Sequence, residues 1–189
     1  DVYKRQVYNL DLRRYSTLIF DFDGVFTDNT VYVDQNGIES VRFSRADGYG
    51  INLLAKAKYL SWHNLNYFVL STEMNPVVAK RCQKMNLPFV QGCSNKYQYL
   101  KERFTKDRFD SEHPFKKLIY VGNDLNDLPI VMEAGFTFCP KDSHPLIKSK
   151  SSYISERNGG QDFVREIIEI LLGFENRGIG EINELISNR

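Results

Sequence analysis

Two aspartates, Asp21 and Asp23, stand at the end of a short apolar segment in this chain of 189 residues. Residues 16–20 predict a buried strand, so both carboxylates come at a strand end, where α/β sheets bind ligands. In extended chain their side chains point to the same side, and two like charges so close repel unless a cation lies between them. Mg²⁺, which prefers oxygen ligands, is the candidate cation. For this pair alone, a simple acidic turn remains the alternative interpretation.

Polar side chains also follow the later strands of the predicted sheet. In chain order these residues are Ser71, Lys96, Asn123, Asp124 and Asp127. Because parallel strands end at the same edge of a sheet, we expect these side chains to converge with Asp21 and Asp23 on one crevice. A hydroxyl, an ammonium group and several carboxylates suit phosphoryl transfer, in which the protein mainly positions groups and neutralises charge.

The elements that must position these residues alternate between strands and helices. Strands are predicted at 16–20, 67–70, 88–91, 117–121, 136–139 and 152–154, and helices at 49–59, 76–85, 96–104, 127–134 and 161–174. Asn36-Gly37 between two alternating segments predicts a hairpin over 30–43, which would form a flap beside the site. Asp47 is expected to cap the helix that begins at Tyr49. The rhythm predicts an α/β fold with a doubly wound parallel sheet.

The length favours a single domain over 17–174, with an N-terminal extension at 1–16 and a polar, partly mobile tail at 175–189. The net charge of +1 gives no electrostatic footprint for nucleic acid or a membrane surface, and no apolar segment is long enough to span a membrane. Three isolated cysteines predict reduced thiols in a cytoplasmic protein. The start without Met leads us to expect a processed chain or a piece of a longer one.

Residues 21–28, Asp-Phe-Asp-Gly-Val-Phe-Thr-Asp, resemble the first motif of the haloacid dehalogenase (HAD) superfamily of aspartyl phosphatases. Ser71 and Lys96 resemble its second and third motifs, and Gly-Asn-Asp-Leu-Asn-Asp at 122–127 resembles its fourth. All four come in the order of the superfamily, each after a predicted strand. The resemblance implies a Rossmann-like core and an enzyme that hydrolyses phosphate esters.

Within the superfamily, the chain resembles the capless 3-deoxy-manno-octulosonate 8-phosphate phosphatases from about residue 18 to residue 172. The segments that carry this resemblance include 45–50, 142–145 and 158–160. Residues 70–78 look more like the phosphatase-type domain associated with bacterial CMP-sialate synthetases, the acylneuraminate cytidylyltransferases. Two positions depart from the octulosonate phosphatases, since Asn123 stands where Asp is common and Glu73 where Arg is frequent.

The resemblance implies roles for the candidate residues. Asp21 would be the nucleophile that forms an aspartyl-phosphate, and Asp23 would act as general acid and then as general base. Lys96 would offset the negative charge of the nucleophile and the phosphate. Substrate contacts would come from Ser71, Thr72, Gly24, Arg45 and Arg165, with the helix of Arg165 approaching an active site, either its own or that of a neighbouring subunit. Mg²⁺ would be held by Asp21, Asp23, Asn123 and Asp124, with Asp127 behind them.

Only the hairpin and one helix fit between 28 and 71, so the sequence leaves no room for a cap domain. The resemblance instead implies a homotetramer whose hairpins assemble around a central axis and whose neighbouring subunits close each other's sites. We therefore expect the substrate to be a small acidic sugar phosphate. Association with a CMP-sugar synthetase domain is a further expectation.

The preferred hypothesis is a Mg²⁺-dependent phosphatase of a 2-keto-3-deoxy sugar acid, either nonulosonate 9-phosphate or octulosonate 8-phosphate. One alternative is an accessory domain that oligomerises an acylneuraminate cytidylyltransferase and has weak or no turnover. Another is a receiver-type phospho-acceptor domain, which would share Asp21, Lys96 and Mg²⁺ but would not need Asp23. Replacing a carboxylate by Asn123 is expected to weaken Mg²⁺ binding.

Overall fold

A computed structural model describes residues 10–106, 113 and 115–187. Its centre is a six-stranded sheet in the order β5-β4-β1-β6-β7-β8, in which every pairing is parallel. The strands are β1 (Thr17–Phe20), β4 (Asn66–Leu70), β5 (Phe89–Val90), β6 (Leu118–Val121), β7 (Phe136–Cys139) and β8 (Tyr153–Ile154). The chain moves outward on one side of β1 and then returns to its other side at β6, which confirms the predicted doubly wound sheet.

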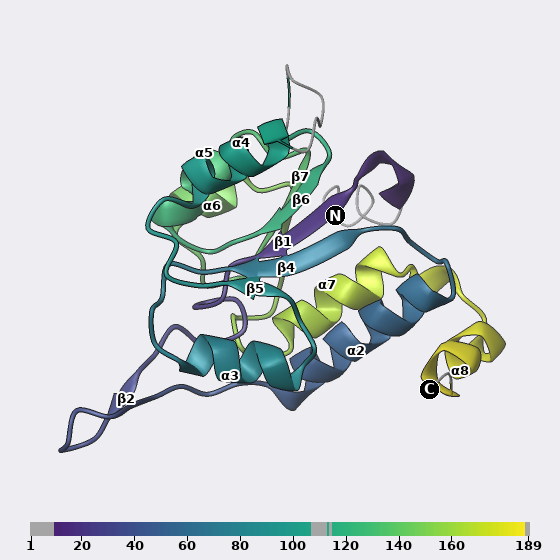
Figure 1. Ribbon diagram of the computed structural model, residues 1–189. Helices are drawn as coiled ribbons and strands as arrows, with labels where there is room; N and C mark the ends of the chain where they lie inside the picture. Colours follow the sequence, from purple (N-terminus) through teal and green to yellow (C-terminus); the bar gives the residue numbers. More distant parts are fainter. Residues whose placement is uncertain (1–9, 107–112, 114, 188–189) are drawn as a thin grey trace.

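Helices cover both faces of the sheet (Figure 1). One face carries α2 (Arg45–Tyr59), α3 (Val77–Lys84) and α7 (Phe163–Leu171), and the other carries α4 (Lys96–Lys106), α5 (Leu128–Val131) and α6 (Pro145–Lys150). Because β1 and β6 lie between two helical layers, every residue of both strands is buried, as is usual for parallel strands covered on both faces. Alternate residues of each strand enter opposite cores, with Phe20 on the α2 and α7 side and Ile19 on the other.

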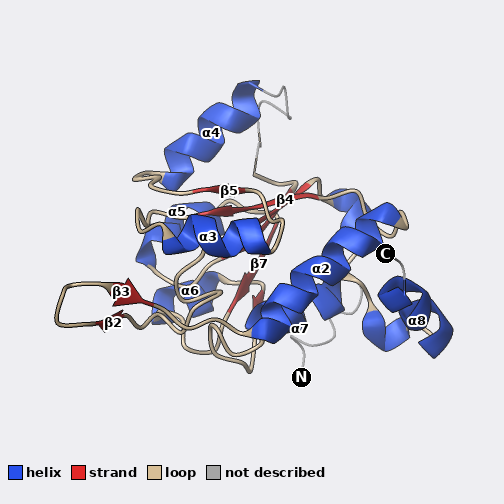
Figure 2. Ribbon diagram, turned by 60° about the horizontal axis from the view of Figure 1, so that its bottom comes forward, coloured by secondary structure: helices blue, strands red, loops and turns tan. Residues whose placement is uncertain are grey.

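The predicted hairpin is present but short. It pairs β2 (Tyr32–Val33) with β3 (Glu39–Ser40), and Figure 2 shows it projecting from the body of the protein. Its turn uses Gly37 at a φ of +75°, a conformation that glycine adopts without strain. In the continuously described segment 10–106, the hairpin and α2 are the only elements between β1 and β4, and α3 and β5 alone separate β4 from α4, so no cap domain interrupts this part of the core.

The helix after the hairpin begins earlier than the sequence predicts, and the expected cap is wrong. Ser44 caps α2, since its Oγ accepts hydrogen bonds from the backbone N–H groups of Ala46 (3.0 Å) and Asp47 (3.4 Å). Asp47 therefore lies inside the first turn of α2. Its carboxylate instead accepts the backbone N–H of Arg165 at 2.8 Å, in the first turn of α7. Asp47 thus caps a different helix from the one predicted.

Several elements were not predicted. They are α6, the 3₁₀ segments η1 (Leu12–Arg14) and η3 (Phe174–Asn176), and α8 (Ile179–Ser187), while the helix expected at 127–134 is divided into η2 (Leu125–Asp127) and α5. The helix α8 contacts α2 and buries Leu185 beyond the domain boundary predicted at 174. Most of the predicted extension 1–16 lies outside the described residues.

In the described part of the chain, no helix has the length and apolar character needed to cross a membrane. The cysteines Cys82, Cys93 and Cys139 are free thiols, as the sequence predicts.

Candidate active site

A buried ion-pair cluster lies where the chain reverses its direction across the sheet, between the ends of β1 and β6. Asp21 follows β1, and its Oδ1 lies 2.6 Å from the Nζ of Lys96, the first residue of α4. The same Nζ lies 2.8 Å from Oδ1 of Asp127. Lys96 is only 2% exposed, so one ammonium group is held between two carboxylates away from water. The structure therefore brings together three of the residues that the sequence singled out.

Burial and mutual repulsion shape the charges of this cluster. Burial raises the pKa of Asp21 to about 8, and the nearby Asp127 adds to this, while Lys96 and the backbone N–H of Phe22 oppose it. Burial by itself would lower the pKa of Lys96, but the two carboxylates outweigh it and raise that pKa. Lys96 is therefore a permanent cation, and a further positive charge near Asp21 would favour its ionised form.

Asp127 holds the far side of the cluster together. Its Oδ1 accepts the Tyr120 hydroxyl at 2.6 Å as well as Lys96, and its Oδ2 accepts the backbone N–H of Asn123 at 2.9 Å. It also completes a capping box with Asp124 at the start of η2. One carboxylate thus fixes both the ammonium group and the loop that carries Asn123 and Asp124.

Asp23 lies at the mouth of the site, less buried than Asp21. Burial raises its pKa, and the charge of Glu73 adds to this, whereas the hydrogen bond from Thr27 at 3.2 Å opposes it. Thr27 also accepts the backbone N–H of Gly24 at 3.1 Å, which closes a tight loop behind Asp23. A side chain at Gly24 has no room, because a Cβ there would lie 1.9 Å from Nδ2 of Asn123. A carboxyl group that keeps its proton to higher pH can serve as a general acid.

Asn123 provides the observation that bears on a metal. It is 6% exposed, and its Oδ1 is buried with no hydrogen-bond partner. A buried amide oxygen without a partner is costly unless water or a cation satisfies it. Among the described residues, no group of three or more His, Cys, Asp or Glu could hold a metal, so a cation here would depend on amide and backbone oxygens as well as Asp21. Oxygen donors of this kind fit Mg²⁺. Asp124 is exposed, and its Oδ1 caps η2 by accepting the N–H of Leu125.

A cleft of about 520 Å³ opens above these groups. It is bordered by the hairpin, the segment after β4 and the loop after β6, with lining residues Asp21, Asp23, Asn29, Thr30, Val31, Glu39, Val41, Thr72, Glu73, Asn75, Val77, Asn123, Asp124, Leu125 and Asn126. Ser71 is buried beside it, and its Oγ accepts the backbone N–H of Glu73 at 3.0 Å, which leaves the hydroxyl proton available for a ligand. Thr72 lines the cleft directly.

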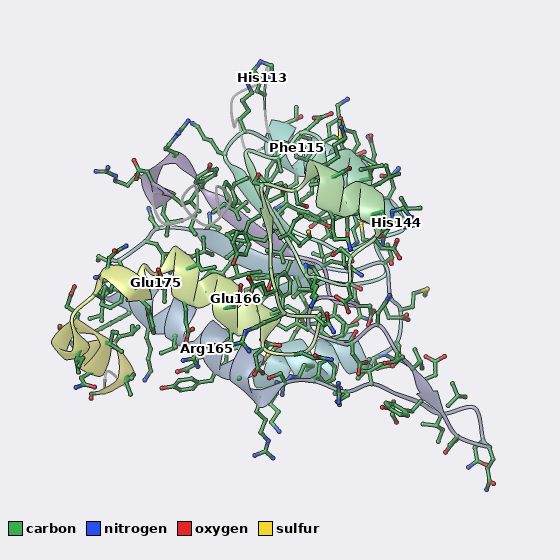
Figure 3. The ribbon with its side chains drawn as sticks, turned by 180° about the vertical axis from the view of Figure 1, so that it is seen from behind. His113, Phe115, His144, Arg165, Glu166 and Glu175 are labelled. Atoms are coloured by element: carbon green, nitrogen blue, oxygen red, sulfur yellow. The ribbon has the colours of Figure 1, made fainter. Side chains whose placement is uncertain are left out.

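Two predicted substrate residues lie elsewhere. Arg165 on α7, labelled in Figure 3, stacks its guanidinium over the Tyr49 ring at 5.0 Å and pairs with Glu169 at 2.6 Å. Arg45 is an exposed residue at the start of α2. Neither lines the cleft, so a single copy of the chain does not bring them to Asp21.

Sequence reasoning missed Tyr120 as a residue that shapes the site, whereas the Gly-Gly loop at 159–160 belongs to a segment that carries the family resemblance. Tyr120 reads as a core residue of β6, and its contact with Asp127 follows only from the direction in which alternate strand residues point. Gly159 and Gly160 press on the loop that carries Asp23, since a Cβ on Gly159 would lie 2.0 Å from the carbonyl oxygen of Gly24. The Gly-Gly pair itself was the available signal for such a close approach.

A scan against models of known protein families finds no match. Among curated proteins, 3-deoxy-D-manno-octulosonate 8-phosphate phosphatase KdsC of Salmonella typhi is 31% identical over 156 residues, which cover 82% of this chain and 78% of that relative. The crystal structure of the same enzyme from Yersinia pestis aligns with a TM-score of 0.72 at 27% identity, over 85% of this chain and 84% of the other.

The structure of this phosphatase from Moraxella catarrhalis contains a magnesium ion, a phosphate ion and a KDO molecule. It aligns with a TM-score of 0.79 over 95% of this chain and 98% of the other, and at 23% identity this likeness shows the fold alone. Membership of a family rests instead on the sequence identity shared over most of both chains with the Salmonella protein. The chain belongs to the KdsC-type 3-deoxy-D-manno-octulosonate 8-phosphate phosphatase family of the HAD superfamily, a family of phosphate-monoester hydrolases.

Proposed function

We propose that this enzyme is a Mg²⁺-dependent phosphatase that releases the terminal phosphate of a 2-keto-3-deoxy sugar acid. The observation that carries the proposal is that Asp21, whose carboxylate contacts the buried Lys96 ammonium, lines the same cleft as Asn123, whose side-chain oxygen has no hydrogen-bond partner. Octulosonate 8-phosphate is the first substrate to test, because the relatives described above are named for it. Nonulosonate 9-phosphate is the second, on the resemblance of residues 70–78.

Asp21 acts as the nucleophile in this proposal. A carboxylate oxygen of Asp21 forms a bond to phosphorus as the bond from phosphorus to the sugar oxygen breaks, which leaves an aspartyl-phosphate and a free sugar. Lys96 lies against the same carboxylate and offsets the charge gathered by the nucleophile and the phosphoryl oxygens. The Ser71 hydroxyl oxygen accepts the backbone N–H of Glu73, and its O–H donates a hydrogen bond to a phosphoryl oxygen.

Asp23 moves the proton. It gives its proton to the departing sugar oxygen, and it later takes a proton from the water that attacks the aspartyl-phosphate. Its raised pKa suits the first of these roles, and its place at the cleft mouth gives it access to both sugar and water. The second displacement returns Asp21 to its carboxylate and releases inorganic phosphate.

The residues that would hold Mg²⁺ are Asp21, Asn123 and the backbone carbonyl of Asp23, with Asp124 at the edge of the site. The buried, unpartnered oxygen of Asn123 supports this set. A bound magnesium ion supplies positive charge to the phosphoryl oxygens. The phosphatase of Moraxella catarrhalis was solved with such an ion and with phosphate.

Phosphate release from both sugar-acid phosphates tests the proposal. We expect Asp21→Asn to lower kcat about 10⁴-fold or more, and Asp23→Asn to lower it about 10²- to 10⁴-fold. An unchanged fold, checked by circular dichroism, keeps these losses interpretable. If the parent protein releases no more phosphate than Asp21→Asn from either substrate, the accessory-domain alternative gains and the proposal fails.

Magnesium binding has its own test, with a matched control in the same loop. Asn123→Asp adds a charged ligand at the orphaned oxygen, so titration calorimetry should show Mg²⁺ binding roughly tenfold tighter. Asn126→Asp adds the same charge to an exposed residue of the cleft and should change the affinity much less. Equal effects of the two substitutions would contradict the ligand assignment of Asn123.

We also propose that the hairpin mediates assembly, as expected for a homotetramer. Val31, Tyr32, Val33 and Ile38 are all more than half exposed, a concentration of apolar surface on one projecting element. Neighbouring copies could then bring Arg45 and Arg165 to each other's clefts. Light scattering of the parent and of Val33→Asp tests this, since a monomer in both cases would exclude it. A cytoplasmic location and association with a synthetase domain stay predictions of the sequence.

A further inference from the structure

The walls of the active-site cleft carry an unusual balance of charge. Five of its lining residues are carboxylates, namely Asp21, Asp23, Glu39, Glu73 and Asp124. Within the described ranges, no Lys, Arg or His lines the cleft, and Lys96 lies buried beneath Asp21. Lys96 and a metal ion at the floor of the cleft would offset the negative charge of the phosphate. Within one copy of the chain, a second negative group close to the phosphate would meet carboxylates and neutral polar side chains on the cleft walls, and no cation among the described lining residues.

Glu73 is held rigidly at one wall. Its Oε1 accepts the backbone N–H groups of Met74 and Asn75, both at 2.7 Å. Its own backbone N–H and carbonyl are bound to Ser71 and Gly92, which fix this segment to the loop after β5.

Glu39 lies on β3 of the hairpin and lines the same cleft. Its Oε2 accepts a hydrogen bond from Nδ2 of Asn75 at 3.1 Å, so it meets the same segment that anchors Glu73. A second contact holds the hairpin base, where Arg42 pairs with Asp28 at 3.0 Å. The two glutamates therefore come from different elements that border one cleft, both contact Asn75, and each has a carboxylate oxygen beyond those used in these bonds.

Aliphatic groups complete the walls. Val31 and Val41 belong to the hairpin side, and Val77 begins α3 on the other. Hydrogen-bond acceptors interspersed with aliphatic surface match a chain of carbon atoms that bear hydroxyl groups, which presents C–H surface and O–H donors in turn. This pattern does not match a carboxylate or a second phosphate.

We infer that Glu39 and Glu73 are specificity determinants, which accept hydrogen bonds from the hydroxyl groups next to the phosphoester and exclude esters with a second anion there. The inference rests on the proposed phosphatase function and narrows its substrate class. The preferred substrates are terminal phosphates of polyhydroxylated chains in which any acid group lies far from the phosphate. An octulosonate 8-phosphate meets this condition, since its carboxylate is at the opposite end of the carbon chain.

A pair of matched esters tests the inference. Glycerol 3-phosphate and 3-phosphoglycerate differ only in a terminal CH₂OH against a carboxylate, and each yields inorganic phosphate with glycerol or glycerate. For the parent enzyme with Mg²⁺, kcat/KM should favour glycerol 3-phosphate by about tenfold or more, as expected for like charges brought together. In Glu39→Gln/Glu73→Gln this ratio should fall by about tenfold, mostly through KM for 3-phosphoglycerate.

Glu184→Gln is the control for net charge. Glu184 is exposed on α8, which Figure 1 shows at the opposite end of the molecule from the hairpin, and this variant should keep the parent's ratio. A ratio near one in the parent, or a ratio unchanged by the double substitution, overturns the inference while phosphatase activity stands. A parent protein that also releases no phosphate from octulosonate 8-phosphate or nonulosonate 9-phosphate overturns the proposed function itself, and the inference falls with it.

Discussion

The buried ammonium of Lys96 offers the sharpest test of how this site is held together. Replacing it by Met keeps a side chain of similar length and removes the charge. Asp21 and Asp127 then lose the cation that lies 2.6 Å and 2.8 Å from their nearest oxygens. Both carboxylates remain buried, and the charge of Asp127 raises the energy of the ionised form of Asp21.

The size of the loss follows from two opposing effects. At an effective dielectric constant near 20, each contact at this distance attracts by about 6 kcal/mol. Burying an ammonium group costs several kcal/mol, so removal of one partner from such a cluster typically leaves a net loss of about 3–5 kcal/mol. We therefore expect Lys96→Met to lower the free energy of unfolding by that amount near pH 8 in metal-free protein. The loss should shrink toward pH 5, because burial raises the pKa of Asp21 and its protonation removes one of the two uncompensated charges.

Urea unfolding followed by circular dichroism, in the presence of a chelator, measures this loss. Lys101→Met is the matched control, because Lys101 is exposed on the same helix and its removal should change stability by less than about 0.5 kcal/mol. The double variant with Asp127→Asn should lose less than the sum of its parts, since the two residues are in direct contact. A loss below about 1 kcal/mol for Lys96→Met, or additive losses in the double variant, would refute the reasoning.

Two further predictions concern the packing behind the site. Gly159→Ala would place a Cβ 2.0 Å from the Gly24 carbonyl oxygen, so kcat for phosphate release and the free energy of unfolding should both fall, the latter by about 2 kcal/mol or more. Gly180→Ala is the control, because a Cβ on this residue of α8 meets no atom nearby, and it should leave kcat unchanged and be neutral or stabilising in urea unfolding. Burial raises the pKa of Asp47 from 3.8 to about 7, so this group contributes stability below pH 4 that is lost as the pH rises to 7. Relative to Asp47→Asn, the free energy of unfolding of the parent should fall by at most ~4 kcal/mol over that pH range. Urea unfolding that gives parallel pH profiles for the two proteins would contradict this prediction.

Much of the fold could be predicted because local patterns and tertiary structure agree. The continuous apolar segments at β1 and β6 are typical of strands buried on both faces, and Asn36-Gly37 locates the hairpin turn. The errors came where long-range contacts decide. Asp47 caps α7 rather than α2, through the backbone N–H of Arg165, and α8 forms in a polar segment because Leu185 can be buried against α2.

The site was predictable to the extent that its residues follow strand ends. Asp21, Lys96 and Asp127 could be grouped because parallel strands end at one edge, which is a property of topology. The direction and the contacts of each side chain do not follow from topology. The free oxygen of Asn123 and the placement of Arg165 on Tyr49 depend on packing between elements distant in sequence, which no local pattern encodes.

The capping of α7 by Asp47 bears on when the enzyme becomes active during its own synthesis. Asp47 binds the N–H of a residue 118 positions further along the chain, and Gly159, which precedes α7 in the sequence, packs closely against the loop of Asp23. Contacts of such sequence separation form late, after the intervening strands have paired. A nascent chain that has exposed its nucleophile and proton donor therefore still lacks the support that shapes them. Phosphatase activity should therefore begin only when β8 has paired with the sheet and α7 has packed against α2, so the onset of turnover marks a late step of folding.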